Sequence, residues 1–162
     1  MMAQLLCRFK RPAPALVTSQ LYNEQTFYRA FERDLACCRN EAVIESPFIT
    51  TRRIQMLLPT LRKMVTRGVR VTINTKHPQE QEDYMCAEAE ASIALLQNIG
   101  VEILFTGGHH RKLAIFDRAV LWEGSLNILS QNDSCEVMRR IESGDCAQQM
   151  LDFTGLTKFL RG

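Results

Sequence analysis

The stretch HRKLAIFDRAVLWEGSLN, residues 110–127, decides the fold that we predict for this chain. Its runs Lys112–Asp117 and Ala119–Glu123 are typical of two β-strands, and the connection between them is short enough for a tight hairpin. A hairpin returns the end of its second strand to the start of its first. The residues that flank it, at 110–112 and 124–127, are therefore expected to lie side by side.

These flanking residues carry the chemistry. Side chains two positions apart share a face of a strand, so His110 and Lys112 should point the same way. Ser125 and Asn127 are also two apart, and Gly124 before them lets a ligand approach the backbone closely. One imidazole, one ammonium, one hydroxyl and one amide would then meet. Such a cluster suits a phosphate, because it offers hydrogen-bond donors, a fixed positive charge and a nitrogen nucleophile.

Each of these residues alone has an ordinary structural explanation. An isolated histidine is more often a hydrogen-bonded core residue, an explanation that fits His109 as well as a place in a loop does. A lone Gly-Ser or Asn can simply form a turn. A functional site is favoured because all the residues occur together at fixed spacing. Asp117 is the exception, since its place at the turn favours a structural role through backbone hydrogen bonds.

Composition sets the class of protein. The 162 residues are 46% hydrophobic and 23% charged, which is ordinary for one globular domain, and the net charge of +2 gives little indication of a partner. No apolar run reaches the length of a membrane span, and the start of the chain lacks the plan of a signal peptide. The six cysteines form no C-x-x-C pair, which favours reduced thiols in a cytoplasmic protein. The three histidines lack zinc-site spacing, so neither a metal nor a cofactor is expected.

The order of the remaining elements predicts the fold class. Helices are expected at Glu24–Cys38, Arg52–Thr66 and Ser143–Phe159, and another that follows Pro78 and the acidic run to Asp83 and ends near Asn98. Further strands are expected at Glu41–Phe48, Val69–Thr75, Val101–Phe105 and Cys135–Ile141. Asn23 should cap the first helix. We predict an α/β fold with a mixed sheet flanked by helices on both faces. Residues 1–22 are expected to form an N-terminal extension or linker, and residues 23–162 the domain.

The pattern H-x-K-x4-D-x6-G-S-x-N is filled at every fixed position, and in this the chain resembles the phospholipase D superfamily. The resemblance implies that His110 is the nucleophile or the acid. It implies that the phosphate oxygens are held by Lys112, Ser125 and Asn127. It also implies a carboxylate that orients the motif histidine, for which Glu136 is the matching position; a surface glutamate at a strand edge explains Glu136 equally well.

In that superfamily, two copies of the His-Lys motif face each other across one site. One histidine attacks phosphorus to give a phosphohistidine, and the other protonates the leaving oxygen and then activates water. This chain carries one copy, because neither His77 nor His109 is followed by the required lysine. We therefore expect a homodimer in which a two-fold partner supplies the second His110. Coupled titration of the two imidazoles would allow them opposite roles.

With its single motif, the chain resembles the nuclease-like members of the superfamily. In Val43–Phe48 and Gly124–Ser130 it also resembles the phospholipase D-like domain at the C-terminus of some bacterial helicases. This favours a metal-independent phosphodiesterase acting on DNA or RNA. Strand contacts could come from Arg52, Arg53, Arg62, Lys63, Arg67 and Arg70, although a solvated surface explains most of them. One alternative is a nucleic-acid-binding or dimerisation module of a helicase-type protein with little turnover. Another is a phospholipid phosphodiesterase, although no basic amphipathic anchor indicates stable membrane association.

Overall fold

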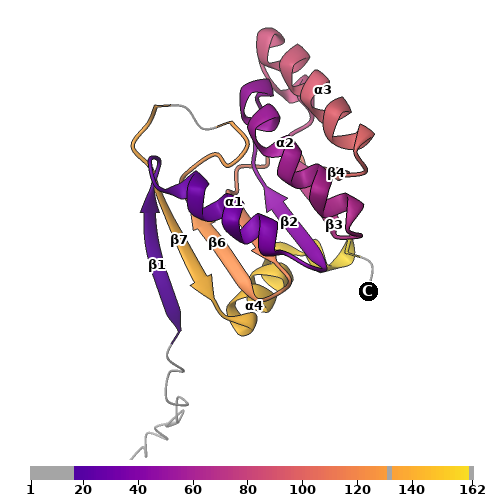
Figure 1. Ribbon diagram of the computed structural model, residues 1–162. Helices are drawn as coiled ribbons and strands as arrows, with labels where there is room; N and C mark the ends of the chain where they lie inside the picture. The colour runs from indigo at the N-terminus through magenta and orange to yellow at the C-terminus, as the bar shows by residue number, and fades with distance from the viewer. Residues whose placement is uncertain (1–16, 131–132, 161–162) are drawn as a thin grey trace, which may run out of the picture.

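The structure, a computed structural model, describes residues 17–130 and 133–160, which build one seven-stranded sheet with helices packed on it (Figure 1). The strands are β1 (Thr18–Asn23), β2 (Glu41–Glu45), β3 (Arg70–Thr75), β4 (Glu102–Phe105), β5 (Leu113–Phe116), β6 (Val120–Gly124) and β7 (Val137–Glu142). The helices are α1 (Phe27–Cys37), α2 (Thr51–Thr66), α3 (Asp83–Asn98) and α4 (Gly144–Thr154), with short 3-10 turns η1 (Pro78–Glu80) and η2 (Leu156–Lys158). The strand order is β1-β7-β6-β5-β2-β3-β4.

The sheet is mixed, as predicted, and β2 is the strand that joins its two halves. It pairs in parallel with β3 and antiparallel with β5, and the hairpin β5–β6 continues antiparallel to β7 and β1. Helices α1, α2 and α3 cover one face, while α4 lies on the other (Figure 1). Ala42 and Ile44 of β2 enter the core under the three helices, and Val43 enters the smaller core under α4. Such a strand reads as a continuous apolar run because both of its faces are buried.

The β5–β6 hairpin has the tight turn that the sequence predicts. Asp117 and Arg118 both have a φ of +51°, and the N–H of Ala119 donates to the carbonyl of Phe116 at 2.9 Å. A two-residue turn with positive φ at both central positions has the twist that matches a hairpin. Arginine rarely adopts such a φ, and here Arg118 is held by an ion pair with Glu41 at 2.8 Å.

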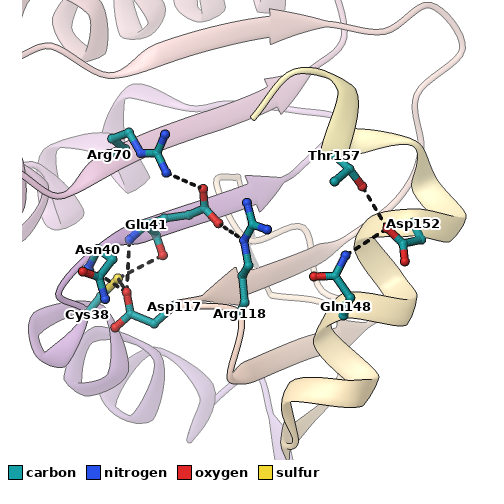
Figure 2. A network of polar contacts seen from close by, with 9 residues as sticks. All are labelled: Cys38, Asn40, Glu41, Arg70, Asp117, Arg118, Gln148, Asp152 and Thr157. Carbon is teal, nitrogen blue, oxygen red and sulfur yellow. Dashed lines mark hydrogen bonds and ion pairs between the residues drawn. The ribbon is translucent and has the colours of Figure 1, made fainter. Parts of the chain in front are cut away.

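Asp117 ties this turn to the start of β2 (Figure 2). Its carboxylate accepts hydrogen bonds from the backbone N–H groups of Asn40 at 2.7 Å, Arg39 at 2.9 Å and Glu41 at 3.0 Å. Burial acts to raise the pKa of Asp117, but these backbone donors outweigh it and hold the pKa below its usual range. The backbone bonds expected of Asp117 are therefore present, although they anchor a neighbouring segment and not the hairpin itself.

The N-terminal part of the domain differs from the prediction. Residues 18–22 belong to β1, which pairs with β7, so the boundary expected between the extension at 1–22 and the domain falls inside a strand. β1 is an edge strand with mostly exposed side chains, and it therefore lacks the apolar alternation that identifies a strand. Asn23 ends β1 and accepts from the N–H groups of Gln25 and Thr26, so it forms a turn before α1 and does not cap the helix. Residues 1–16 lie outside the described residues.

The last helix is shorter than predicted. Ser143 caps α4 as expected, since its hydroxyl accepts from the N–H of Cys146 at 3.2 Å. The helix ends at Thr154 because Gly155, with a φ of +72°, takes the left-handed conformation that terminates helices. The chain then turns into η2, which Asp152 binds back to α4 by accepting from Gln148 and Thr157 (Figure 2). Similarly, β2 ends at Glu45 and not at the predicted Phe48.

Candidate active site

The residues of the predicted cluster line one cleft. The cleft has a volume of about 970 Å³ and lies where β5 and β7 begin and β6 ends. Its lining includes His110, Lys112, Gly124, Ser125, Asn127 and Glu136. The hairpin therefore brings together the two ends of the motif, as the spacing of the sequence predicts.

Gly124 is required at this point, but for a reason that the sequence did not indicate. Its N–H donates to the carbonyl of Lys112 at 3.3 Å, which closes the hairpin beside the motif lysine. A Cβ at Gly124 would lie 2.1 Å from the carbonyl oxygen of Val137 and 2.9 Å from Cα of Met138. The close approach is therefore made by the backbone of β7. The expectation that this glycine makes room for a ligand is corrected accordingly.

His110 and Lys112 contact each other at the mouth of the cleft. The ammonium nitrogen of Lys112 lies 2.8 Å from Nδ1 of His110 and donates to its backbone carbonyl at 2.9 Å. The same ammonium nitrogen lies 3.4 Å from Nε2, so it is within reach of both ring nitrogens. Burial lowers the pKa of Lys112; the Glu136 carboxylate acts to raise it and the charge of Lys76 acts to lower it.

Glu136 positions Ser125. The hydroxyl of Ser125 donates to the Glu136 carboxylate and accepts from the N–H of Val137 at 3.1 Å. The other carboxylate oxygen of Glu136 accepts from Ser134 at 2.7 Å. Among the described residues the carboxylate binds these two hydroxyls and makes no hydrogen bond to His110. The contact by which Glu136 was expected to orient His110 is therefore absent among the described residues.

Asn127 is held in the cleft by the segment that follows it. Its carbonyl accepts from the N–H of Ser130 at 3.0 Å, and the next turn is tied to β2 and α2 through hydrogen bonds of Leu129 with Ser46 and Thr50. The side-chain oxygen of Asn127 is buried and has no hydrogen-bond partner among the described residues. An amide group carries two N–H donors, which suit the oxygens of a phosphate.

Arg111, the variable residue between His110 and Lys112, also lines the cleft and was missed from the sequence. Its Nε and Nη2 contact the two oxygens of Glu45 at 2.6 and 2.7 Å, and the Glu45 side chain is fully buried. The Asn74 amide donates to the same carboxylate at 2.6 Å. One sequence signal could have indicated this pair: Glu45 interrupts an otherwise apolar strand, and a buried carboxylate requires a partner.

His109 is a core residue, and only 3% of it is exposed. It lies in the loop between β4 and β5, as one of the two predicted alternatives has it, and its ring is buried there. Neither ring nitrogen makes a hydrogen bond of normal geometry to a described residue. Burial lowers its pKa, with the Glu45 carboxylate acting in the opposite direction. His109 therefore differs from His110, whose side chain is exposed.

Several of the basic residues expected to contact a strand stabilise the fold. Arg67 donates to the carbonyls of Ala36 and Cys38 at 3.1 and 3.2 Å. Arg70 pairs with Glu41 at 3.3 Å, at the end of β2 opposite to the cleft (Figure 2). The guanidinium of Arg53 lies 3.5 Å from the centre of the Tyr28 ring. These three arginines are therefore not grouped around the cleft.

Within 17–130 and 133–160, no three or more His, Cys, Asp or Glu side chains are grouped so as to hold a metal ion. The five cysteines of this part of the chain form no disulfide with one another. None of its helices combines the length and the apolar character needed to cross a membrane.

Solved structures of similar fold agree with this architecture. Nuc from Salmonella typhimurium, a phospholipase D family member, superposes with a TM-score of 0.69 at 15% identity, over 85% of this chain and 91% of Nuc. NucT from Helicobacter pylori gives 0.68 at 15% identity, over 85% of this chain and 92% of NucT. Phosphatidylserine synthase from Haemophilus influenzae gives 0.62 at 15% identity, over 90% of this chain and 38% of the synthase. No curated protein sequence matches significantly. The sequence profile described as "Cardiolipin synthase, PLD-like domain" matches residues 32–154, and the chain therefore belongs to this phospholipase D-like family.

Proposed function

We propose that this chain is a phosphodiesterase that cleaves DNA or RNA with His110 as its nucleophile. The observation that carries the proposal is the 2.8 Å contact between Nδ1 of His110 and the ammonium of Lys112, in a cleft that Ser125 and Asn127 also line. A nitrogen nucleophile thus lies beside a fixed positive charge and two further donors. This is the arrangement that attack on a phosphodiester requires.

The proposed reaction has two displacements. A ring nitrogen of His110 attacks phosphorus, the bond from phosphorus to the leaving oxygen breaks, and a second imidazole protonates that oxygen. The same imidazole then takes a proton from water, which attacks the phosphohistidine and releases His110. Lys112 neutralises the charge that develops on the phosphate oxygens, with Ser125 and Asn127 as donors. Glu136 acts as a positioning residue, because it holds the Ser125 hydroxyl and supports the charge of Lys112.

The second imidazole is proposed to come from an identical partner. The sequence contains one H-x-K, and His110 is exposed, so its ring is accessible to a second chain. The cleft is bordered by the apolar side chains of Leu21, Val137 and Phe153, of which 62%, 50% and 87% is exposed. An apolar border around a half-site is the kind of surface that an isologous dimer covers.

We favour nucleic acid as the substrate because of the resemblance to nuclease-like, single-motif members and because Lys112, Arg111 and Arg139 place three cations in the cleft. The same apolar border favours a second candidate, hydrolysis of a phospholipid. A helicase domain elsewhere in a longer protein and a cytoplasmic location both stay predictions.

The test is turnover by purified protein in excess chelator. We expect hydrolysis of bis(p-nitrophenyl) phosphate and of single-stranded DNA or RNA to persist, because Lys112 supplies the positive charge that a metal ion would otherwise supply. Phosphatidylcholine and cardiolipin vesicles measure the lipid activity in parallel. Loss of all activity in chelator, with recovery in Mg²⁺ or Zn²⁺, would refute the mechanism. Faster hydrolysis of the vesicles than of either nucleic acid would identify a phospholipid as the substrate.

A further inference from the structure

We propose that Arg111, held in place by Glu45, forms a second phosphate subsite in the cleft. This subsite takes a phosphate that neighbours the scissile one in a nucleic acid strand. The inference rests on the proposed function and adds to it a specific requirement, namely that the substrate carries more than one phosphodiester.

Arg111 is placed to bind an anion from the cleft. Its side chain is 42% exposed, and its backbone position lies directly between His110 and Lys112. Two of its nitrogens, Nε and Nη2, bind Glu45, whereas Nη1 makes no hydrogen bond to any described residue. A guanidinium carries five N–H donors, so donors remain for an incoming phosphate.

Glu45 fixes the orientation of the Arg111 guanidinium before any anion binds. The carboxylate is fully buried at the end of β2, where it receives the Asn74 amide as well as the arginine. Asn74 in turn accepts from the hydroxyl of Thr106 at 3.0 Å, so β3 and the segment after β4 both contribute to fixing the pair. The negative end of the ion pair therefore lies inside the protein and the positive end lies at the cleft. An orientation fixed before binding costs no rearrangement when an anion arrives.

The subsite is distinct from that of the scissile phosphate. Lys112 contacts His110, whereas the guanidinium of Arg111 is turned toward Glu45, so Arg111 does not point with His110 and Lys112. All three nevertheless line the same cleft, whose volume of about 970 Å³ is at the upper end for a single small ligand. A strand that places one phosphate at His110 would bring a neighbouring phosphate toward Arg111.

The chain contains a matched ion pair for comparison. At the opposite end of β2, Glu41 is also buried and pairs with the half-exposed Arg118 at 2.8 Å, beside Arg70 (Figure 2). Both pairs join a carboxylate of β2 to an arginine that lies in the β5–β6 turn or just before β5. Of the two arginines, Arg111 lines the cleft and Arg118 does not. A purely structural function would apply to both pairs equally.

The experiment uses the double variant Glu45→Gln/Arg111→Gln. It removes the cation without leaving a buried carboxylate unpaired, which the single Arg111 variant would do. Two substrates are compared: bis(p-nitrophenyl) phosphate, with one phosphodiester, and a short oligothymidylate. We expect kcat/KM for the first to change less than about threefold, and KM for the oligonucleotide to rise roughly tenfold. The slope of log KM against log salt should weaken by about 0.7, the value for one phosphate contact to a single strand.

Arg118→Gln is the control, and it should leave both substrates and the salt slope unchanged, since Glu41 retains Arg70. Equal losses on both substrates, or an unchanged salt slope, would overturn the subsite. Cardiolipin, which has two phosphodiesters, is assayed in parallel as vesicles. If only its turnover falls in the double variant, the Arg111 subsite binds a lipid and not a nucleic acid. If the wild-type chain cleaves no substrate, the proposed function fails. In that case, fluorescence anisotropy measures the affinity of the wild type and of the double variant for oligothymidylate. Weaker binding by the double variant would still support the Arg111 subsite, and equal binding would refute it.

Discussion

The ammonium nitrogen of Lys112 lies 2.8 Å from Nδ1 and 3.4 Å from Nε2 of His110, within reach of both ring nitrogens. The contact places the positive charge that would bind a phosphate beside the nitrogen that would attack it. Nucleophile and phosphate ligand are therefore arranged before any substrate binds.

The pH dependence of activity should report this lysine. Burial lowers the pKa of Lys112 from its ordinary value of 10.5, so the ammonium loses its proton at a lower pH than an exposed lysine does. We expect kcat/KM to fall on the alkaline side at a pH below 10.5 as this charge is lost. Lys112→Arg should remove the alkaline limb, because arginine stays charged, although its planar shape should slow the reaction. An identical limb in the variant would contradict the assignment.

Substitution of the two adjacent histidines should have different effects: His110→Ala should reduce activity, and His109→Ala should reduce stability. His110→Ala removes an exposed nucleophile, and we expect kcat to fall by about four orders of magnitude with an unchanged melting temperature. His109→Ala empties a buried position, and we expect a loss of about 1–3 kcal/mol in unfolding free energy with kcat within about tenfold. Kinetics and thermal denaturation of both variants measure this. A phosphoryl adduct on any residue other than His110 would refute the roles.

A mixing series tests whether two chains share one site. Wild-type and His110→Asn chains are refolded together in equal amounts, after light scattering has established the oligomeric state. If each site needs both copies of His110, only pure wild-type dimers are active, and about one quarter of the activity remains. Independent sites would leave about half of it. A linear fall across the series, or a fully active monomer, would exclude the shared site.

Asp117 should be a residue of stability and not of catalysis. Asp117→Asn places an N–H₂ group among the backbone donors of Arg39, Asn40 and Glu41, and we expect unfolding to become easier by about 2–4 kcal/mol. Because the folded state lowers the pKa of Asp117, its contribution is present above its ordinary value of 3.8 and is lost as the pH falls through the lowered value. The difference between the two proteins, measured by urea denaturation, should therefore shrink in acid.

Asp152→Asn is the control for this change. Among the described residues, the carboxylate of Asp152 accepts from the exposed side chains of Gln148 and Thr157 (Figure 2), so we expect a change below about 0.5 kcal/mol. Asp117→Asn protein assayed well below its melting temperature should keep its kcat. A large loss of kcat in the folded variant would show that Asp117 takes part in the reaction.

Gly124→Ala should weaken the pairing of β6 with β7. The added Cβ would lie 2.1 Å from the carbonyl oxygen of Val137, a contact that only movement of a strand can relieve. We expect a loss of about 2–3 kcal/mol or failure to fold, measured by thermal denaturation. Gly144→Ala serves as the control. A Cβ at Gly144 approaches nothing nearer than 3.4 Å, and alanine favours the helix that Gly144 begins, so stability should be equal or higher.

Local sequence determined the hairpin and the cluster at its open end. A two-residue turn sets the strand register, and that register returns the segment of Ser125 and Asn127 to the cleft that His110 and Lys112 also line. The alternation of apolar strands with amphipathic helices likewise predicted a mixed sheet with helices on both faces. These features depend on periodicity and on neighbours in the chain, which a single sequence contains.

Tertiary structure decided what depends on contacts between distant segments. Arg111 is a variable position of the motif until Glu45, 66 residues away, meets it across the sheet. The edge strand β1 has no apolar pattern and exists because β7 offers it a backbone partner. Gly124 looks like a ligand contact until the carbonyl of Val137 is seen to occupy the space. In each case the structure depends on a favourable pairing or a steric exclusion between segments that are far apart in the chain. Local sequence propensity carries no information about such contacts.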